Sequence, residues 1–130
     1  MSAPERSFVP VLLRRTVIGG VRVVVLAGEL DLACIPVLDR VLARAPARAT
    51  PNVAVDLRRV RFIDCSILHP FVAAHDAARS HGGCLRVVAT RGEPLTVLRA
   101  TGLTGLFCLH TTLRDATAPF CARHAAASNT

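Results

Sequence analysis

The chain has 130 residues and is basic, with a formal net charge of +7 and a pI near 10.9. Hydrophobic residues make up 52% of it, which excludes a disordered chain and suits one compact domain. The first residues, MSAPERS, lack the apolar stretch of a signal peptide, and no apolar run is long enough to span a bilayer. We therefore expect a cytoplasmic protein that does not enter a membrane.

The basic residues are all arginines, and they are spread along the chain rather than gathered in a run. The sequence also contains no Trp or Tyr that could stack on bases. We therefore interpret the positive charge as a solvated surface and expect no direct contact with nucleic acid.

The cysteines number five, and no two of them are spaced as CxxC. An odd number without that spacing argues against a disulfide framework and against a zinc site. We expect most of these cysteines to be small apolar core residues, and we expect no metal or cofactor.

The N-terminal part of the chain predicts a pair of strands after a loose tail at residues 1–7. The first strand covers 8–14 and the second, rich in β-branched residues, covers 21–27. The Gly19-Gly20 pair between them predicts a turn.

A helix and a third strand follow. Asp31 is placed to cap the helix, which has Pro36 in its first turn. Four apolar residues share one face of this helix: Ile35, Leu38, Val41 and Leu42. A loop at 45–51 leads to a strand over 53–57, and the apolar segment 60–63 comes after it.

The second half predicts a helix over 70–80, ended by His81-Gly82-Gly83, with four inward residues. These are Phe71, Val72, Ala74 and Ala78. A strand over 84–89, a helix over 93–100 and a strand over 106–110 come next. Thr112 and Asp115 fit a capping box for a last helix.

The resulting order, β-β-α-β-α-β-α-β-α, predicts a single α/β domain. Strands that alternate with helices favour a mostly parallel or mixed sheet of four to five strands covered by helices. The domain should span 8–118, and residues 1–7 and 119–130 should be flexible tails.

Three acidic residues stand where predicted strands end and helices begin. Glu29 and Asp31 follow one strand, and Asp64 follows another. This edge of an open α/β sheet often carries function, so the carboxylates could act as acid and base or hold a metal. No further ligand set accompanies them, and we interpret Asp31 as a helix cap and Asp64 as a residue that caps or borders a helix.

Cys65 and His69 are four residues apart, a spacing that on a helix would bring a thiol nucleophile next to a base. Pro70 delays the predicted helix and so breaks that geometry. His69, His75 and His81 recur in steps of six, which do not return to one helical face. We therefore expect solvated or half-buried histidines rather than a metal site.

Four segments, taken in order, show a family pattern: GELDL at 28–32, VAVDLRRVRFIDCSIL at 53–68, HGGCLRVVA at 81–89 and LRATGLTGLFCLH at 98–110. Together they resemble the STAS domain family, and within it the bacterial anti-anti-sigma factors. The resemblance covers about residues 8–118.

The resemblance implies a regulatory protein rather than an enzyme. In this family the domain binds a serine kinase that also acts as an anti-sigma factor, which frees the sigma factor for transcription. The kinase then phosphorylates a serine at the start of the second helix, and the added charge of about −1.5 to −2 releases the domain. The implied partner-binding residues here are Glu29, Asp31, Asp64, Cys65, Ser66, Ile67 and Pro70.

The phosphorylation site departs from the family pattern, which is Asp-Ser-Ser-Gly-Leu with the first Ser as acceptor. This sequence has Asp64, Cys65, Ser66, Ile67 and Leu68 at those positions. A kinase tuned to a hydroxyl should not use the Cys65 thiol, and Ile67 adds bulk where the family has Gly. The resemblance therefore implies the fold and the class of partner without the usual serine switch.

Three interpretations of Cys65 follow. We favour an inert, buried thiol in a domain that its kinase cannot release. Ser66 could instead act as the acceptor, although on a helical start it points about 100° away from the family position. Cys65 could also be a redox sensor, which needs an exposed thiol of low pKa.

Two other functions stay open. The altered loop and the basic charge are compatible with a module that senses a small molecule or nucleotide within a larger regulatory complex. A thiol enzyme built on Cys65 is a further alternative, and it requires a titratable thiolate.

Overall fold

The computed structural model describes residues 11–44, 51–90, 92–102 and 105–119. Its strands are β1 (Leu12–Ile18), β2 (Val21–Leu30), β3 (Val53–Ile63), β4 (Leu85–Val88) and β5 (Cys108–His110). Its helices are α2 (Ile35–Arg44), α3 (Leu68–Ser80), α4 (Glu93–Ala100) and α5 (Leu113–Ala116). Two short 3₁₀ turns, η1 (Leu32–Cys34) and η2 (Cys65–Ile67), lead into α2 and α3.

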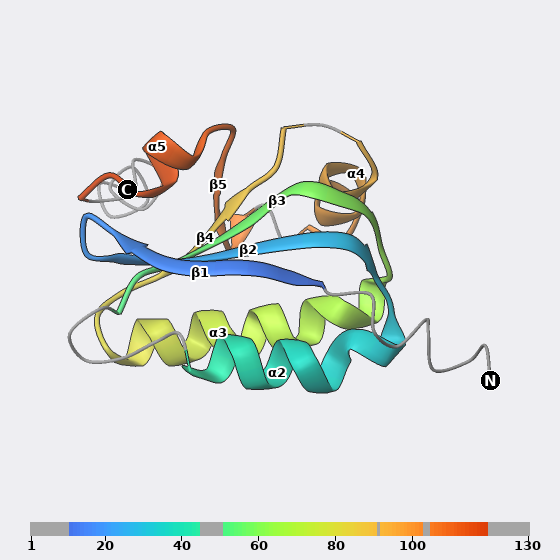
Figure 1. The fold of residues 1–130 in the computed structure, drawn as a ribbon, viewed down its shortest axis with the longest axis horizontal. Helices are drawn as coiled ribbons and strands as arrows, with labels where there is room; N and C mark the ends of the chain where they lie inside the picture. The colour runs from blue at the N-terminus through green and yellow to red at the C-terminus, as the bar shows by residue number, and fades with distance from the viewer. Residues whose placement is uncertain (1–10, 45–50, 91, 103–104, 120–130) are drawn as a thin grey trace.

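The strands form one sheet in the order β1-β2-β3-β4-β5. β1 is antiparallel to β2, and the other neighbours are parallel. Helices α2 and α3 cover one face of the sheet, and α4 and α5 lie on the other (Figure 1). The predicted class, a mixed α/β sheet in the order β-β-α-β-α-β-α-β-α, is confirmed. The predicted tails lie outside the described residues except for Pro119, as does most of the predicted loop at 45–51.

A tight turn at Gly19 and Gly20 joins β1 to β2. Both glycines have a positive φ, 58° and 83°, which suits a two-residue hairpin turn and disfavours residues with a Cβ. Ile18 therefore pairs directly with Val21. The prediction of a first strand over 8–14 placed it too early, because pairing with β2 continues up to the turn; residues 8–10 lie outside the described part.

β3 runs without a break through Arg58 and Arg59, where the sequence predicted an interruption after Leu57. Two register shifts against β2 accommodate this segment. Within the strand, the buried Asp56 accepts hydrogen bonds from Nε and Nη2 of Arg58 at 2.9 and 2.8 Å. β3 ends at Ile63, and the short turn η2 connects it to the start of α3.

The carboxyl end of α3 lies where the sequence predicted it. Gly82 has a φ of 84°, its N–H donates to Arg79 O at 3.1 Å, and the Gly83 N–H donates to Ala78 O at 2.8 Å. This is the Schellman pattern that glycine favours. A Cβ at Gly83 would collide with the backbone carbonyl of Pro51, so this glycine also permits a close approach of two chain segments.

The C-terminal elements follow the prediction with small shifts, and β4 is one residue shorter at each end than the strand predicted over 84–89. α4 has the predicted bounds, whereas β5 begins at Cys108 rather than at Leu106. Thr112 caps α5 as expected, since its Oγ1 accepts the Asp115 N–H at 3.1 Å. No helix within the described residues is long and apolar enough to cross a membrane.

The main hydrophobic core lies between the sheet and the α2–α3 pair. Side chains from both helices pack against the strands, including Leu38, Leu42, Phe71, Ala74, Val24, Leu26, Val55 and Val87. A smaller cluster lies between the sheet and α5 and contains Val21, Val23, Val25, Ala54, Val88 and Ala116. On α3 the predicted inward residues are buried except Val72, which is half-buried.

His75 departs from the expectation of solvated or half-buried histidines, because it is buried in α3. Its ring lies edge-on to Phe107 with centroids 5.7 Å apart, and its Nδ1 lies 3.4 Å from the Leu85 backbone nitrogen. Aromatic packing and a backbone partner therefore accommodate this imidazole inside the domain.

Candidate functional site

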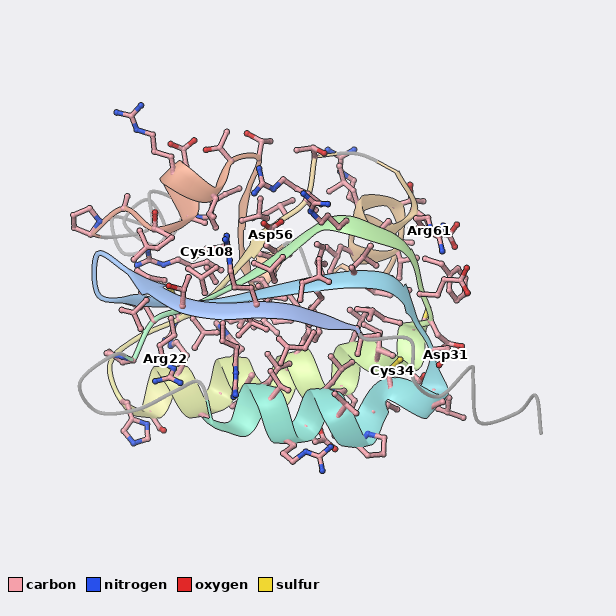
Figure 2. All side chains as sticks on the ribbon, in the orientation of Figure 1. Arg22, Asp31, Cys34, Asp56, Arg61 and Cys108 are labelled. Atoms are coloured by element: carbon pink, nitrogen blue, oxygen red, sulfur yellow. The ribbon has the colours of Figure 1, made fainter. Side chains whose placement is uncertain are left out.

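The candidate site lies where β2 and β3 end. These strands are parallel, and their last residues, Leu30 and Ile63, are register partners. The Asp64 N–H donates to Leu30 O at 2.9 Å, which ties the two strand ends together. Asp31 and Asp64 therefore open neighbouring turns at the carboxyl ends of the parallel strands β2 and β3. Figure 2 shows Asp31, Cys34 and Arg61 at this end of the sheet, away from Arg22.

Asp31 opens the turn that leads into α2. Its backbone is extended (φ −116°, ψ −172°), and its Oδ1 accepts the Ala33 N–H at 3.1 Å. This satisfies one of the amide groups that a helical start leaves without an intrahelical acceptor. The predicted capping role is confirmed, although the first capped element is the 3₁₀ turn η1 rather than the α-helix itself.

Asp64 repeats this arrangement before α3. Its backbone is also extended (φ −86°, ψ 143°), and its Oδ1 accepts the Ser66 N–H at 2.9 Å. The hydrogen bond from the Ser66 backbone lowers the pKa of the Asp64 carboxyl below its ordinary value, so the group is a carboxylate at neutral pH. The predicted role of Asp64 as a cap is confirmed.

Cys65 and Ser66 differ in exposure although they are adjacent in η2. Cys65 is an exposed free thiol. The Ser66 hydroxyl oxygen is buried, and the Ser66 side chain faces the Asp64 carboxylate and helps to lower its pKa. Our expectation that Cys65 is a buried filler was therefore wrong, because the capped turn directs the first residue after Asp64 toward solvent. The exposed nucleophile of this turn is the thiol.

Ile67 and Pro70 belong to the interior rather than to the expected contact surface. Ile67 is fully buried in the main core, and Pro70 is buried in the first turn of α3. α3 begins at Leu68, two residues before the predicted start, because Pro70 falls where a helix N–H needs no acceptor. Because both side chains are buried, they can affect a partner only by shaping the exposed turn that contains Cys65.

Glu29 and Arg61 form an exposed ion pair beside the turns, with Oε2 and Nη2 3.6 Å apart. Their side chains are 63% and 77% exposed, so the pair adds little stability. Both groups thus remain accessible to a partner at this edge.

Two apolar residues at this edge were missed by sequence reasoning. Leu32 is 65% exposed and Phe62 is 38% exposed. Helical spacing puts Leu32 on the same face as Ile35, but the 3₁₀ turn rotates by about 120° per residue instead of 100° and turns Leu32 outward. Phe62 is the register partner of Glu29 at the end of β3. We name the exposed residues of this edge the strand-end surface: Glu29, Asp31, Leu32, Arg61, Phe62 and Cys65, with the half-buried Asp64.

Cys34 lies half-buried behind the first turn. Its thiol donates to Glu29 O at 3.5 Å and lies 3.6 Å from Oδ1 of Asp31. Burial raises the pKa of this thiol, so it is protonated at neutral pH. Among the described residues no group of three or more His, Cys, Asp or Glu side chains is placed to hold a metal ion.

Two more cysteines lie elsewhere in the fold. Cys84 and Cys108 are buried, with Sγ atoms 3.7 Å apart. Cys108 is disulfide-bonded, whereas Cys34, Cys65 and Cys84 are free thiols. The sequence argued against a framework of several disulfides and did not predict this single bond at Cys108.

The chain is similar in sequence and in structure to known proteins. The family model of the STAS domain matches residues 13–116. An anti-sigma factor antagonist from Mycobacterium paratuberculosis is 30% identical with a TM-score of 0.72, over 81% of this chain and 88% of that chain. The antagonist SpoIIAA in its unphosphorylated form is 15% identical with a TM-score of 0.61, over 79% and 90% of the two chains. A sulfate transporter family protein from Wolinella succinogenes is 17% identical with a TM-score of 0.65, over 88% and 93%. No curated protein matches the sequence.

Proposed function

Because the chain belongs to the STAS domain family, we propose that it acts as an anti-sigma factor antagonist, or anti-anti-sigma factor. In this proposal the strand-end surface binds a kinase-type anti-sigma factor, and the sigma factor is thereby free to direct transcription. Binding alone performs this function, so it requires no catalytic group on the chain itself.

The make-up of the strand-end surface is the observation that carries the proposal. Leu32 and Phe62 are exposed apolar side chains. The exposed Asp31 precedes Leu32 in the chain, and the exposed Glu29 is the register partner of Phe62. Protein interfaces typically combine an apolar centre with a polar rim. A relative at 30% identity over most of both chains is itself described as an anti-sigma factor antagonist, which supports the same partner class.

Release of the partner should differ from the usual serine switch. Cys65 presents a thiol at the position where the family carries its acceptor hydroxyl. The nearest hydroxyl, on Ser66, is buried, and the N–H of the same residue is bonded to Asp64 at 2.9 Å. A kinase would have to open the capped turn to reach Ser66. These features support a domain that binds its partner without being released by phosphorylation of this turn.

A binding experiment with matched variants tests this function. Anti-sigma factor kinases encoded in the same genome are mixed with the protein, and the affinity of the complex is measured. The variant Leu32→Ser/Phe62→Ser should bind at least tenfold more weakly, since anchor residues near an interface centre contribute about 1–2 kcal/mol or more each. The control Asp76→Ser/Arg79→Ser shortens two exposed side chains of α3 and should bind within about twofold of the wild type. The proposal fails if no such kinase binds the wild type, or if both variants weaken the complex equally.

A further inference from the structure

The two edges of the sheet differ in length and in exposure. β5 forms one edge with three residues, and β1 forms the other with seven. β1 also exposes Leu13, Val17 and Ile18, with exposed fractions of 47%, 53% and 39%. The other exposed large hydrophobic residues of the described chain are Leu32, Phe62 and Leu106, none of which lies on β1. The β1 edge is therefore a second apolar surface, separate from the strand-end surface.

The backbone of β1 has a strand on one side only. β1 pairs with β2, and no other strand of the described residues lies beside it (Figure 1). Its register is irregular between Leu12 and Arg14 but continuous from Arg14 to Ile18. The outward N–H and C=O groups of this regular part are a template on which a further strand can pair.

We propose that β1 is a docking edge for an extended segment of a partner protein, in which two adjacent acidic residues are flanked by apolar ones. The charge of β1 argues for acidic residues, because LLRRTVI contains exposed Arg14 and Arg15 and no Asp or Glu. Neither arginine has an ion pair within the described part of the chain. The exposed Leu13 and Val17 argue for apolar residues in the same segment, since cross-strand pairs of opposite charge and of apolar side chains both stabilise a sheet.

A second copy of this chain fits the edge poorly. Pairing two β1 strands would bring together the two arginines of each copy with no carboxylate on either strand. Each copy also carries a net charge of +7. Like charges on paired strands are destabilising, and arginine at an edge is one of the devices by which proteins avoid pairing with themselves.

Three labelled heptapeptides test the proposal: one of Val and Thr with two adjacent Glu residues at its centre, one with Lys in place of both Glu residues, and the Glu peptide N-methylated at alternate residues. Fluorescence anisotropy should show that the Glu peptide binds, whereas the Lys and the N-methylated peptides bind at least tenfold more weakly, because one has the wrong charge and the other cannot pair through its backbone. Arg14→Gln/Arg15→Gln should weaken binding of the Glu peptide at least tenfold. Arg79→Gln/Arg99→Gln, on exposed parts of α3 and α4, should not.

Two outcomes would overturn the proposal. One is equal binding, or no binding, of the Glu and Lys peptides. The other is a dimer in sedimentation experiments that Val17→Asp dissociates, because a second copy would then occupy the edge. The variant Leu32→Ser/Phe62→Ser should bind the Glu peptide like the wild type, so this test is independent of the proposed antagonist function.

Discussion

Arg86, buried on β4, donates through Nη1 to the backbone carbonyls of Ala116 at 3.0 Å and Ala118 at 2.6 Å. The two carbonyls lie at the end of α5, where the backbone has no further helical donors and carries partial negative charge. This single side chain therefore joins the last helix to strand β4 of the sheet. The buried Arg86 guanidinium thus donates hydrogen bonds to peptide oxygens rather than to a carboxylate.

Arg86→Met should detach α5 from the sheet, because the shorter apolar side chain leaves both carbonyls without their donor. We expect the free energy of unfolding to fall by about 2–3 kcal/mol, in the range of a buried polar group left unpaired. Urea unfolding measures this loss, and hydrogen exchange should show reduced protection of the α5 amides. Arg99→Met, at an exposed position of α4, is the control. Equal stability of the two variants would contradict the role of Arg86.

The Asp56–Arg58 pair predicts a pH dependence of stability. Burial of Asp56 favours its neutral form, but the hydrogen bonds from Arg58 outweigh this effect, so the pKa of Asp56 lies below its ordinary 3.8. A lowered pKa in the folded state stabilises the protein above the unfolded pKa, and this contribution disappears as the pH falls through the folded pKa.

Arg58→Gln should therefore lower the free energy of unfolding at pH 7 by about 1–2 kcal/mol, a modest value because the Arg58 side chain is 43% exposed. The difference from the wild type should begin to shrink as the pH falls below about 4, where Asp56 of the variant takes up a proton, and should disappear only below the lowered pKa of Asp56 in the folded wild type. Thermal unfolding from pH 3 to pH 8 measures it, with Arg79→Gln as the control. A difference that stays constant over this range would contradict the assignment.

Gly83 is predicted to tolerate no side chain. A Cβ there would collide with the carbonyl carbon and oxygen of Pro51, and backbone atoms cannot move aside as a flexible side chain can. Gly83→Ala should destabilise the protein by roughly 1–3 kcal/mol, as overpacking does elsewhere. Gly105→Ala meets nothing within 4 Å and should change stability by less than about 0.5 kcal/mol. Similar denaturation midpoints for the two variants would show that this close approach does not constrain the fold.

The exposure of Cys65 predicts the order in which the free thiols react. N-ethylmaleimide should modify Cys65 first, the half-buried Cys34 more slowly, and the buried Cys84 only when the domain opens. Peptide mass spectrometry at several times measures the three rates. The bulky adduct on Cys65 should also block the anti-sigma factor, while Cys65→Ser should bind with or without the reagent. Equal rates at Cys65 and Cys84 would contradict the described burial.

The identity of residue 65 also predicts whether a partner kinase can phosphorylate this turn. A partner kinase with ATP should leave Cys65 unmodified, because a kinase that transfers phosphate to a hydroxyl should not use a thiol. Cys65→Ser restores an exposed hydroxyl at the same place and should gain one phosphate. Mass spectrometry distinguishes the outcomes, and phosphate on residue 65 of the wild type would overturn the proposed loss of the switch.

Local features of the chain were predictable because they depend on neighbouring residues. The Gly19-Gly20 turn, the caps at Asp31 and Asp64, and the glycine-rich end of α3 each follow from a side chain and the backbone within a few positions of it. Element bounds were less accurate where pairing with another strand decided them. β1 follows the register of β2, and β3 continues through Arg58 and Arg59 because it keeps pairing with β2 across a register shift.

The sequence by itself determined the fold class, the order of strands and helices, and the two carboxylate-capped turns at one edge of the sheet. Only the tertiary structure decided which side chains of those turns reach a partner. It exposes Leu32 and Cys65, and it buries the Ser66 hydroxyl, Ile67 and Pro70. The physical reason is that exposure depends on how each 3₁₀ turn is rotated against the sheet and helices beneath it. That rotation is set by contacts between residues far apart in the chain, which spacing along the sequence does not contain.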